Sequence, residues 1–280
     1  MPFIKKFGED FVIENNEIKL TPKYIEANKH KFKKITGSRF ASVLGMNNFS
    51  TSVKTWAMMV GIYTEPMDQM IADAGNVIEP KIKNYVEETT GIKYMQYNPM
   101  KVGFDIFKEN PIFGGIPDGE PVDENGNVNY ATWPMLEIKT SSIDSFLYKK
   151  QNNLFVLQKD ENGEPIIKSV GTKRQKWFSA DNNVIIPDEY KFQLGLYCYL
   201  RNITKGLFAV CFLTKDDYVN PYKCDVHDRE IQLVEFNVDL NSFKYWVDKA
   251  EQWYKEYITQ GHSPKLKIED QDWLKAELKL

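Results

Sequence analysis

Residues 136–140, Leu-Glu-Ile-Lys-Thr, constrain the fold more than any other stretch of this chain. Successive side chains of a β-strand point to opposite faces, so Leu136 and Ile138 share one face while Glu137 and Lys139 share the other. The apolar face requires a hydrophobic core beside it. The two charges on the other face require partners or a polar site. The stretch therefore predicts a strand whose second face carries chemistry.

The composition limits the class of protein. Of the 280 residues, 42% are hydrophobic and 14% aromatic, which is enough to bury a substantial core. The net charge of −3 means that any contact with nucleic acid requires a local basic patch. Three cysteines without a CxxC pair favour a reducing compartment, so we expect a cytoplasmic protein. No stretch approaches the ~18 consecutive apolar residues of a membrane span, and no membrane role is expected.

The order of the predicted elements indicates one mixed α/β (α+β) domain over residues 1–280. Hydrophobic periodicity predicts helices near 38–44, 52–60 and 68–90, strand-rich sequence from 92 to 140, a helix from 188, strands at 206–214 and 231–240, and a C-terminal helix at 241–259. Pro80 is expected to bend or break the third helix. Asn125-Gly126 predicts a type I′ turn. Residues 1–34 are interpreted as an N-terminal extension and 143–183 as an inserted hairpin.

The residues with the clearest chemical potential are carboxylates. Asp118 lies in the turn-rich stretch Gly-Gly-Ile-Pro-Asp-Gly-Glu, one hairpin before Glu137, so adjacent antiparallel strands would bring the two together. Their oxygens are the hard ligands that Mg²⁺ and Mn²⁺ prefer, and Lys139 on the same face could orient a water molecule. The alternative is that Asp118 only forms a turn and that Glu137 and Lys139 form an exposed ion pair. The sequence contains no GxxxxGK[ST] phosphate-binding loop, and its three histidines are scattered.

A family resemblance becomes specific when these residues are read with other blocks. Ile-Pro-Asp-Gly followed by Leu-Glu-Ile-Lys resembles the PD-(D/E)xK nuclease signature, and KITGSRFASVLG (34–45), AGNVIEP (74–80) and DEYKFQLGLYCYL (188–200) occur around it in order. The arrangement is similar to the phage-type recombination exonucleases of the YqaJ and lambda exonuclease group over about residues 30–215. The resemblance implies a restriction-endonuclease-like core, with a mixed central sheet flanked by helices.

The resemblance also implies roles for individual residues. The implied metal ligands, for two Mg²⁺ ions that Mn²⁺ can replace, are Glu79, Asp118, Glu137 and the backbone carbonyl of Ile138. The implied catalytic residues are Asp118, Glu137, Lys139 and Gln193. The implied DNA-binding residues are Lys31, Ser38, Arg39, Ser141 and Tyr190.

Three positions depart from the family pattern. Lys31 stands where the phage enzyme has a phosphate-binding arginine, Arg39 replaces an acidic residue, and Ile116 replaces a serine. Lysine binds phosphate as a point charge without a bidentate fork. These departures leave the metal core intact and weaken the inference of a pocket for a 5′-phosphate.

The implied function is a Mg²⁺-dependent DNA exonuclease that hydrolyses duplex ends, 5′→3′, for recombination or repair. The alternatives are a PD-(D/E)xK endonuclease of repair or restriction and an inactive module that binds DNA ends. The implied partners are double-stranded DNA ends, a single-strand annealing protein and two further copies in a three-fold ring. Basic stretches at 29–34 and 171–176 are candidate DNA surfaces, and Trp177 is either a stacking platform for a base or a plain hydrophobic contact.

Overall fold

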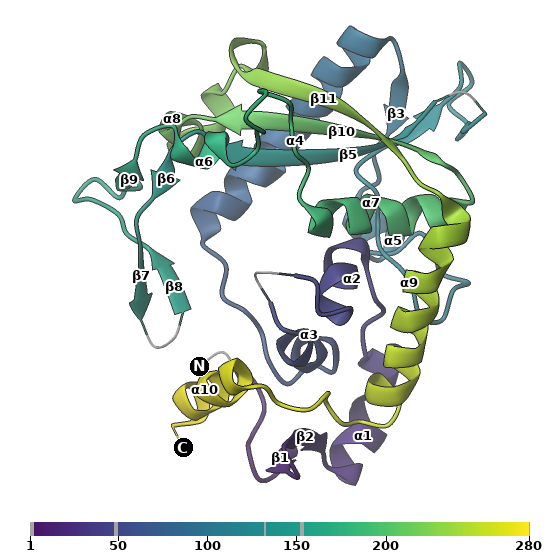
Figure 1. Cartoon of the computed structure of the whole chain (residues 1–280), viewed down its shortest axis with the longest axis vertical. Coiled ribbons are helices and arrows are strands. Elements are labelled where there is room, and N and C mark those ends of the chain that lie inside the picture. The colour runs from purple at the N-terminus through teal and green to yellow at the C-terminus, as the bar shows by residue number, and fades with distance from the viewer. Residues whose placement is uncertain (1–2, 48–49, 132, 152–153, 280) are drawn as a thin grey trace.

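The centre of the fold is a three-stranded sheet in the order β11–β10–β5 (Figure 1). The computed structural model describes residues 3–47, 50–131, 133–151 and 154–279. β5 (Met135–Ser142) pairs in parallel with β10 (Lys205–Leu213), which pairs antiparallel with β11 (Glu230–Asn237). Helices cover this sheet on both faces, so the predicted mixed α/β fold is confirmed.

Two helices determine the environment of the two faces of β5. α4 (Gln69–Thr90) packs its buried residues against the face that carries Leu136 and Ile138. α7 (Asp188–Arg201) packs against the opposite face, which contains Phe208 of β10. Phe208 is the register partner of Glu137, so the charged face of β5 is turned toward α7. The alternation predicted for residues 136–139 is therefore confirmed.

The N-terminal half of the chain is helical where predicted. α2 (Gly37–Val43) and α3 (Ser52–Met59) are short helices, and the side chain of Thr51 caps α3 by accepting from the backbone N–H of Lys54. α4 begins after Asp68, whose side chain caps it, and ends at Gly91 with a left-handed φ of 74°. It continues through Pro80 without a break. Favourable capping and a buried apolar face outweigh the one hydrogen bond that proline removes.

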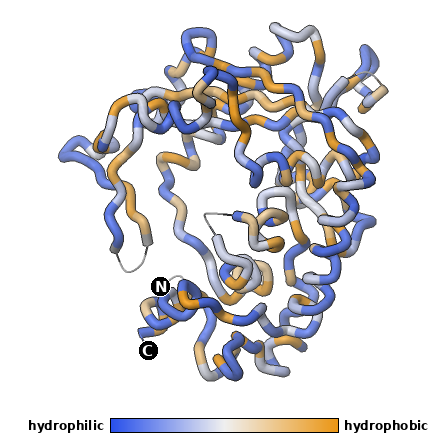
Figure 2. The backbone as a smooth tube through the Cα atoms, in the orientation of Figure 1, coloured by the Kyte–Doolittle hydropathy of each residue, from blue (hydrophilic) through white to orange (hydrophobic). Residues whose placement is uncertain are grey.

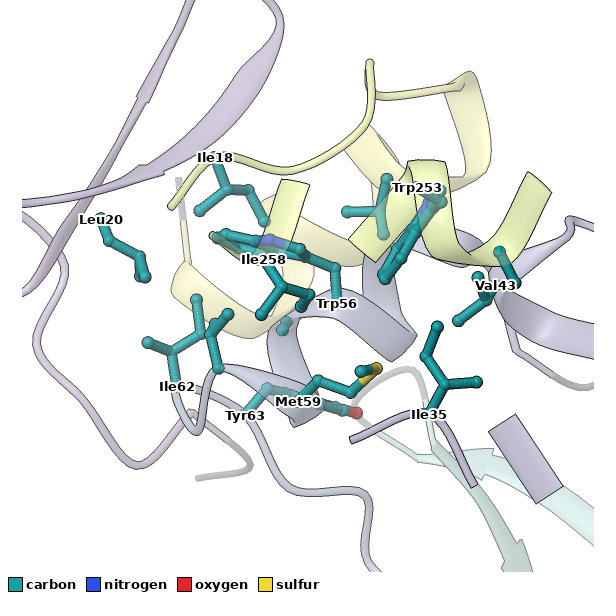
Figure 3. Packing of buried hydrophobic residues seen from close by; sticks show 14 of the residues in the cluster. Ile18, Leu20, Ile35, Val43, Trp56, Met59, Ile62, Tyr63, Trp253 and Ile258 are labelled. Atoms are coloured by element: carbon teal, nitrogen blue, oxygen red, sulfur yellow. The ribbon is translucent and has the colours of Figure 1, made fainter. Parts of the chain in front are cut away.

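A second hydrophobic core lies below the sheet (Figure 3). Trp56 of α3 is fully buried there, and Trp253 of α9 (Leu240–Trp253) packs with it. The aromatic stripe of α9 is thus part of the core. The elements that complete this core are β1 (Phe11–Glu14), β2 (Glu17–Leu20), α1 (Pro22–Asn28) and α10 (Ile268–Leu278).

Residues 143–183 form small projecting elements beside the sheet (Figure 1). They comprise β6 (Ser145–Phe146), β7 (Tyr148–Gln151), β8 (Leu154–Leu157), β9 (Ile167–Ser169) and α6 (Thr172–Gln175). Figure 2 shows hydrophilic residues along the projecting loops and hydrophobic ones concentrated in the central strands. Among the described residues, no helix is long and apolar enough to cross a bilayer.

Some local predictions between 92 and 130 were wrong. The strand-rich reading holds for β3 (Lys93–Met95) and β4 (Glu120–Val122), but residues 99–102 form the helical turn α5 (Pro99–Val102), capped by Asn98. In the turn after β4, Gly126 has a positive φ of 78° whereas Asn125 does not. A type I′ turn needs positive φ at both residues, so its assignment was incorrect.

The fully buried Glu120 provides a test of the packing around the sheet. Its carboxylate accepts bonds from the Arg201 guanidinium at 2.6 and 3.0 Å and from the hydroxyls of Tyr97 and Tyr130. Arg201→Leu leaves this carboxylate without its cation. We expect the free energy of unfolding, measured by urea denaturation, to fall by about 2 to 4 kcal/mol. The loss should be smaller than for a fully buried pair because Arg201 is partly exposed.

A matched control is Lys244→Ala, which removes the exposed pair with Asp248. We expect no measurable change in unfolding because solvent screens such pairs. Equal stability of Arg201→Leu and the wild-type protein would contradict the role given to Glu120.

Candidate active site

The charged face of β5 carries a buried ion pair. The Glu137 side chain is 0% exposed, and its Oε1 lies 2.6 Å from Nζ of Lys139. The lysine also donates to Oε1 of Gln193 on α7 at 3.2 Å and lies 4.9 Å from the centre of the Tyr190 ring. Gln193 and Tyr190 are one helical turn apart and so reach the same lysine. The exposed ion pair that the sequence left open is excluded.

Asp118 reaches β5 from the neighbouring segment, as predicted. Gly119 bridges Leu136 in antiparallel orientation, and Oδ2 of Asp118 accepts from the backbone N–H of Ile138 at 2.7 Å. Glu79 approaches from α4. Asp118 and Glu79 line one cleft of about 490 Å³. Three carboxylates from three segments of the chain therefore gather at one edge of the sheet.

Burial and mutual repulsion dominate the electrostatics of these groups. Burial, with the charge of Asp118, raises the pKa of Glu79 to about 7. The same two causes raise the pKa of Glu137, and burial raises the pKa of Asp118. Burial alone would lower the pKa of Lys139, but the carboxylates of Glu137 and Asp118 raise it above its usual value. The site thus contains one lysine cation for three carboxyl groups that are costly to ionise.

The donor set fits a divalent cation. Oε2 of Glu137 is buried without a hydrogen-bond partner, and an unpaired buried carboxylate oxygen is expensive unless an ion or water satisfies it. Carboxylate oxygens are also the ligands that Mg²⁺ and Mn²⁺ prefer. Within the described ranges, no group of three or more His, Cys, Asp and Glu side chains is already arranged so that it could hold a metal ion. The carboxylates are close enough to influence one another's pKa without forming a complete ligand shell.

The aromatic residues near Lys139 form a support for it. The Trp177 ring stacks on Tyr190 with centroids 5.7 Å apart, and its Nε1 donates to Oγ of Ser141 at 3.0 Å. Trp177 and Ser141 are both buried, with 6% and 5% exposure. The hydrophobic interpretation of Trp177 is confirmed. The hydroxyl of Ser141 is occupied inside the protein, and the DNA contact predicted for Ser141 stays a prediction.

A basic hollow of about 650 Å³ adjoins the acidic cleft, with Pro99 and Ile116 on the walls of both. Ser38 and Arg39 line it as the sequence suggested, whereas the exposed Lys31 does not; Lys33 occupies that wall instead. The charges of Lys33 and Arg39 repel each other, and this adds to burial in lowering the pKa of Lys33.

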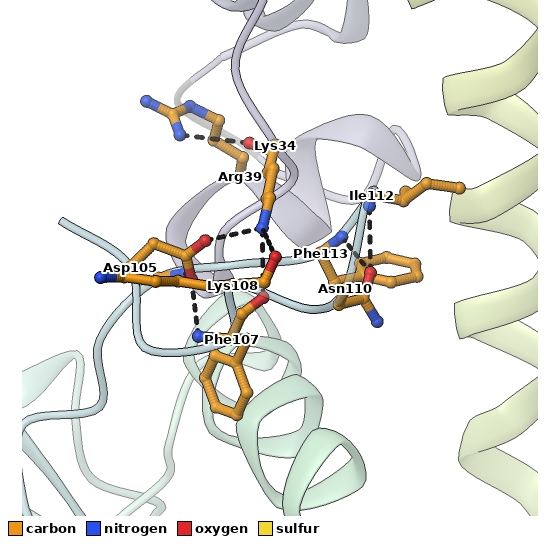
Figure 4. Close-up of polar contacts among 9 residues, drawn as sticks. Lys34, Arg39, Asp105, Phe107, Lys108, Asn110, Ile112 and Phe113 are labelled. Carbon is orange, nitrogen blue, oxygen red and sulfur yellow. Dashed lines mark hydrogen bonds and ion pairs between the residues drawn. The ribbon is translucent and has the colours of Figure 1, made fainter. Parts of the chain in front are cut away.

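The neighbouring Lys34 contributes little free charge to this hollow. Its Nζ lies 2.7 Å from Asp105 and also donates to the carbonyl of Phe107 (Figure 4). The guanidinium of Arg39 donates to the carbonyl of Lys34 and to the Thr36 hydroxyl. Lys33 and Arg39 are therefore the cations that an anion in this hollow would meet.

Sequence reasoning missed two residues of the site. Lys33 lies in the same basic run as Lys31, and only the packing shows which lysine faces the hollow. Tyr97 lines the acidic cleft and donates its hydroxyl to the buried Glu120. Glu120 lies two residues after Asp118, and this spacing was the signal in the sequence for a further carboxylate here.

The raised pKa of Glu79 predicts how stability depends on pH without metal. Below about pH 4.5 the carboxyl is protonated in both states; above it the unfolded chain ionises first, so stability falls until about pH 7. In EDTA, the free energy of unfolding of Glu79→Gln minus that of the wild-type protein should therefore increase by about 2 kcal/mol as the pH rises from 5 to 8. Urea denaturation at each pH measures it. A difference that does not change with pH would contradict the assignment.

Comparisons with known proteins place this geometry in context. Residues 23–163 match the model of the YqaJ-like viral recombinase domain. The chain is 50% identical to the uncharacterized protein MG373 of Mycoplasma genitalium and 47% identical to its homolog in Mycoplasma pneumoniae, in each case over 98% of both chains.

Two solved structures are similar at low identity. A phage-related exonuclease from Haemophilus somnus has a TM-score of 0.49 at 14% identity, covering 84% of this chain and 97% of that one. The alkaline exonuclease LHK-Exo from Laribacter hongkongensis has a TM-score of 0.46 at 12% identity, covering 82% and 91%. The family model spans Ser38, Glu79, Asp118, Glu137 and Lys139. The chain therefore belongs to the family of the YqaJ-like viral recombinase domain.

Proposed function

We propose that this chain is a divalent-metal-dependent deoxyribonuclease that resects duplex DNA ends for recombination or repair. The observation that carries the proposal is the meeting of Glu79, Asp118 and Glu137 around Lys139, with a buried oxygen of Glu137 left unpaired. Family membership supports the same reaction class.

The three carboxylates and the backbone carbonyl of Ile138 would hold the metal, which we propose to be Mg²⁺, with Mn²⁺ able to substitute and two ions bound. When bound, such ions supply Lewis-acid chemistry for phosphodiester hydrolysis. Metal binding also removes the electrostatic cost of ionising three neighbouring carboxyls. The raised pKa values of Glu79 and Glu137 mean that metal affinity should increase as pH rises.

Lys139 would orient the attacking water toward the phosphorus atom. Its ammonium is held from three sides, by Glu137, by Gln193 and by the face of the Tyr190 ring. Restraint on this scale limits the positions that a bound water can take, and correct positioning accounts for much of the catalysis of such reactions. Gln193 and Tyr190 thus act in the proposal through the lysine.

The basic hollow supports recognition of a terminal phosphate. Lys33, Arg39 and the hydroxyl of Ser38 line it, and it meets the acidic cleft at Pro99 and Ile116. Cations and hydroxyls bind phosphate oxygens by charge-assisted hydrogen bonds. A 5′-phosphate held there would place the adjacent phosphodiester in the cleft, which corresponds to 5′→3′ polarity. A three-fold ring and a single-strand annealing partner remain predictions for measurement of mass in solution and for co-purification.

Lys139→Ala should reduce the rate of digestion of linear duplex DNA in Mg²⁺ by roughly 10²- to 10⁴-fold, because the water is no longer oriented. Release of labelled nucleotides measures the rate. Lys191→Ala, which changes an exposed lysine of α7, is the control with unchanged rate. Full activity of Lys139→Ala would refute the site. Cleavage of closed circular duplex would favour an endonuclease, and binding of ends without hydrolysis by the wild-type protein would favour an inactive module.

Arg39→Ala should reduce the preference for 5′-phosphorylated over 5′-hydroxyl ends. Loss of a charged hydrogen bond of about 1.5 to 3 kcal/mol corresponds to roughly 10- to 150-fold. Digestion of duplexes labelled at either end and carrying either terminus measures it. Lys31→Ala is the matched control, since Lys31 does not line the hollow. Equal losses in both variants, or none in Arg39→Ala, would contradict phosphate binding at this position.

A further inference from the structure

A second hollow lies on the other flank of α4 from the acidic cleft. It has a volume of about 660 Å³ and is bounded by α4 on one side and by α8 (Lys215–Val219) with the turn Pro221–Lys223 on the other. Asn76 lines both this hollow and the cleft that contains Glu79 and Asp118. The two spaces therefore adjoin at one residue, a single helical turn before Glu79.

The most prominent residue of this hollow is Tyr222, whose side chain is 82% exposed. Lys81 of α4 holds the turn that carries it, because its Nζ donates to the carbonyls of Pro221, Tyr222 and Cys224 at 3.2, 2.9 and 2.7 Å. Among the described residues, no other aromatic ring stacks on Tyr222. The protein thus presents an unused aromatic face from a rigidly held turn.

The chemistry of the hollow suits an unpaired nucleotide. An exposed aromatic ring stacks on any base, because every base has a π-face. Lys223 follows Tyr222 and is also exposed on the wall, where it could meet a backbone phosphate. The one acidic side chain on the wall, Asp73, accepts a hydrogen bond from Gln69 at 2.7 Å. Met70 supplies apolar surface on the α4 side.

We propose that Tyr222 forms a base-stacking subsite for the DNA strand that leaves the acidic cleft, with the strand crossing α4 at Asn76 and its phosphate near Lys223. This inference rests on the proposed function for the identity of the ligand. It adds a binding subsite outside the residues that hold the metal or the terminal phosphate.

Binding of a fluorescently labelled single-stranded oligonucleotide to the full chain in EDTA tests the subsite without cleavage. Tyr222→Ala should weaken binding by roughly 5- to 150-fold, and Tyr222→Phe should retain it, because stacking requires the ring and not the hydroxyl. Tyr245→Ala removes another exposed tyrosine, on α9, and should bind like the wild-type protein. Wild-type affinity in Tyr222→Ala, or an equal loss in Tyr245→Ala, would overturn the proposal.

Photocrosslinking identifies the strand. Bromodeoxyuridine placed in the cleaved strand of a duplex should crosslink to Tyr222, and the adduct is mapped by mass spectrometry. Crosslinks at Tyr222 only from the uncleaved strand would overturn the proposal.

Activity separates this inference from the proposed function. With saturating linear duplex in Mg²⁺, Tyr222→Ala should keep the wild-type maximal rate while its KM rises. Hydrolysis with an unchanged KM would overturn the subsite alone. A different outcome is that the wild-type protein hydrolyses no DNA, while Tyr222→Ala still binds single strands more weakly than the wild-type protein does. In that case the proposed function fails and the subsite stands.

Discussion

The buried ion pair between Glu137 and Lys139 is the interaction on which the rest of the site depends. A carboxylate with no exposure to solvent is tolerated only with a cation close by, and the 2.6 Å contact provides it. The pair lies on β5, whose opposite face is fixed by Leu136 and Ile138 in the core beneath α4. Because the strand cannot shift by one residue without exchanging its two faces, the core determines where the charges point.

One lysine cannot neutralise three neighbouring carboxyl groups. The missing positive charge makes the folded protein less stable when these groups ionise, and it also makes the site suitable for a cation. The pKa values of Glu79, Asp118 and Glu137 are all raised, so the folded protein pays for a site that suits a divalent cation. Further from the cleft, charged side chains are paired locally. Arg201 forms an ion pair with Glu120, and Lys34 forms one with Asp105. The acidic cleft and the basic hollow beside it contain several such perturbed groups next to one another. Such concentration of perturbed groups is typical of functional sites.

Local signals predicted elements with strong caps or a clear hydrophobic pattern, and missed elements with a weak pattern. The side chains of Thr51 and Asp68 accept hydrogen bonds from the first turns of α3 and α4, and the backbone N–H of Gly91 closes α4, so the ends of these helices could be read from sequence. By contrast, α5 is only one turn, and α10 has a weakly amphipathic pattern that was not recognised. α10 packs against a distant segment, since the ring of Trp273 contacts that of Tyr63. At Asn125-Gly126, the side chain of Asp123 accepts from the backbone N–H groups of Asn125 and Asn127, a contact that the dipeptide alone does not predict.

By itself, the sequence determined the strand with two unlike faces, the identity of the carboxylates and the family to which the blocks belong, because these depend on residues near one another or on order along the chain. Only the tertiary structure decided which of several similar side chains face the site. It turned Lys33 and not Lys31 into the basic hollow, withdrew Ser141 beneath Trp177, and placed Tyr222 beside α4. The physical reason is that exposure and direction of a side chain are set by contacts between segments far apart in the chain, which no local pattern encodes.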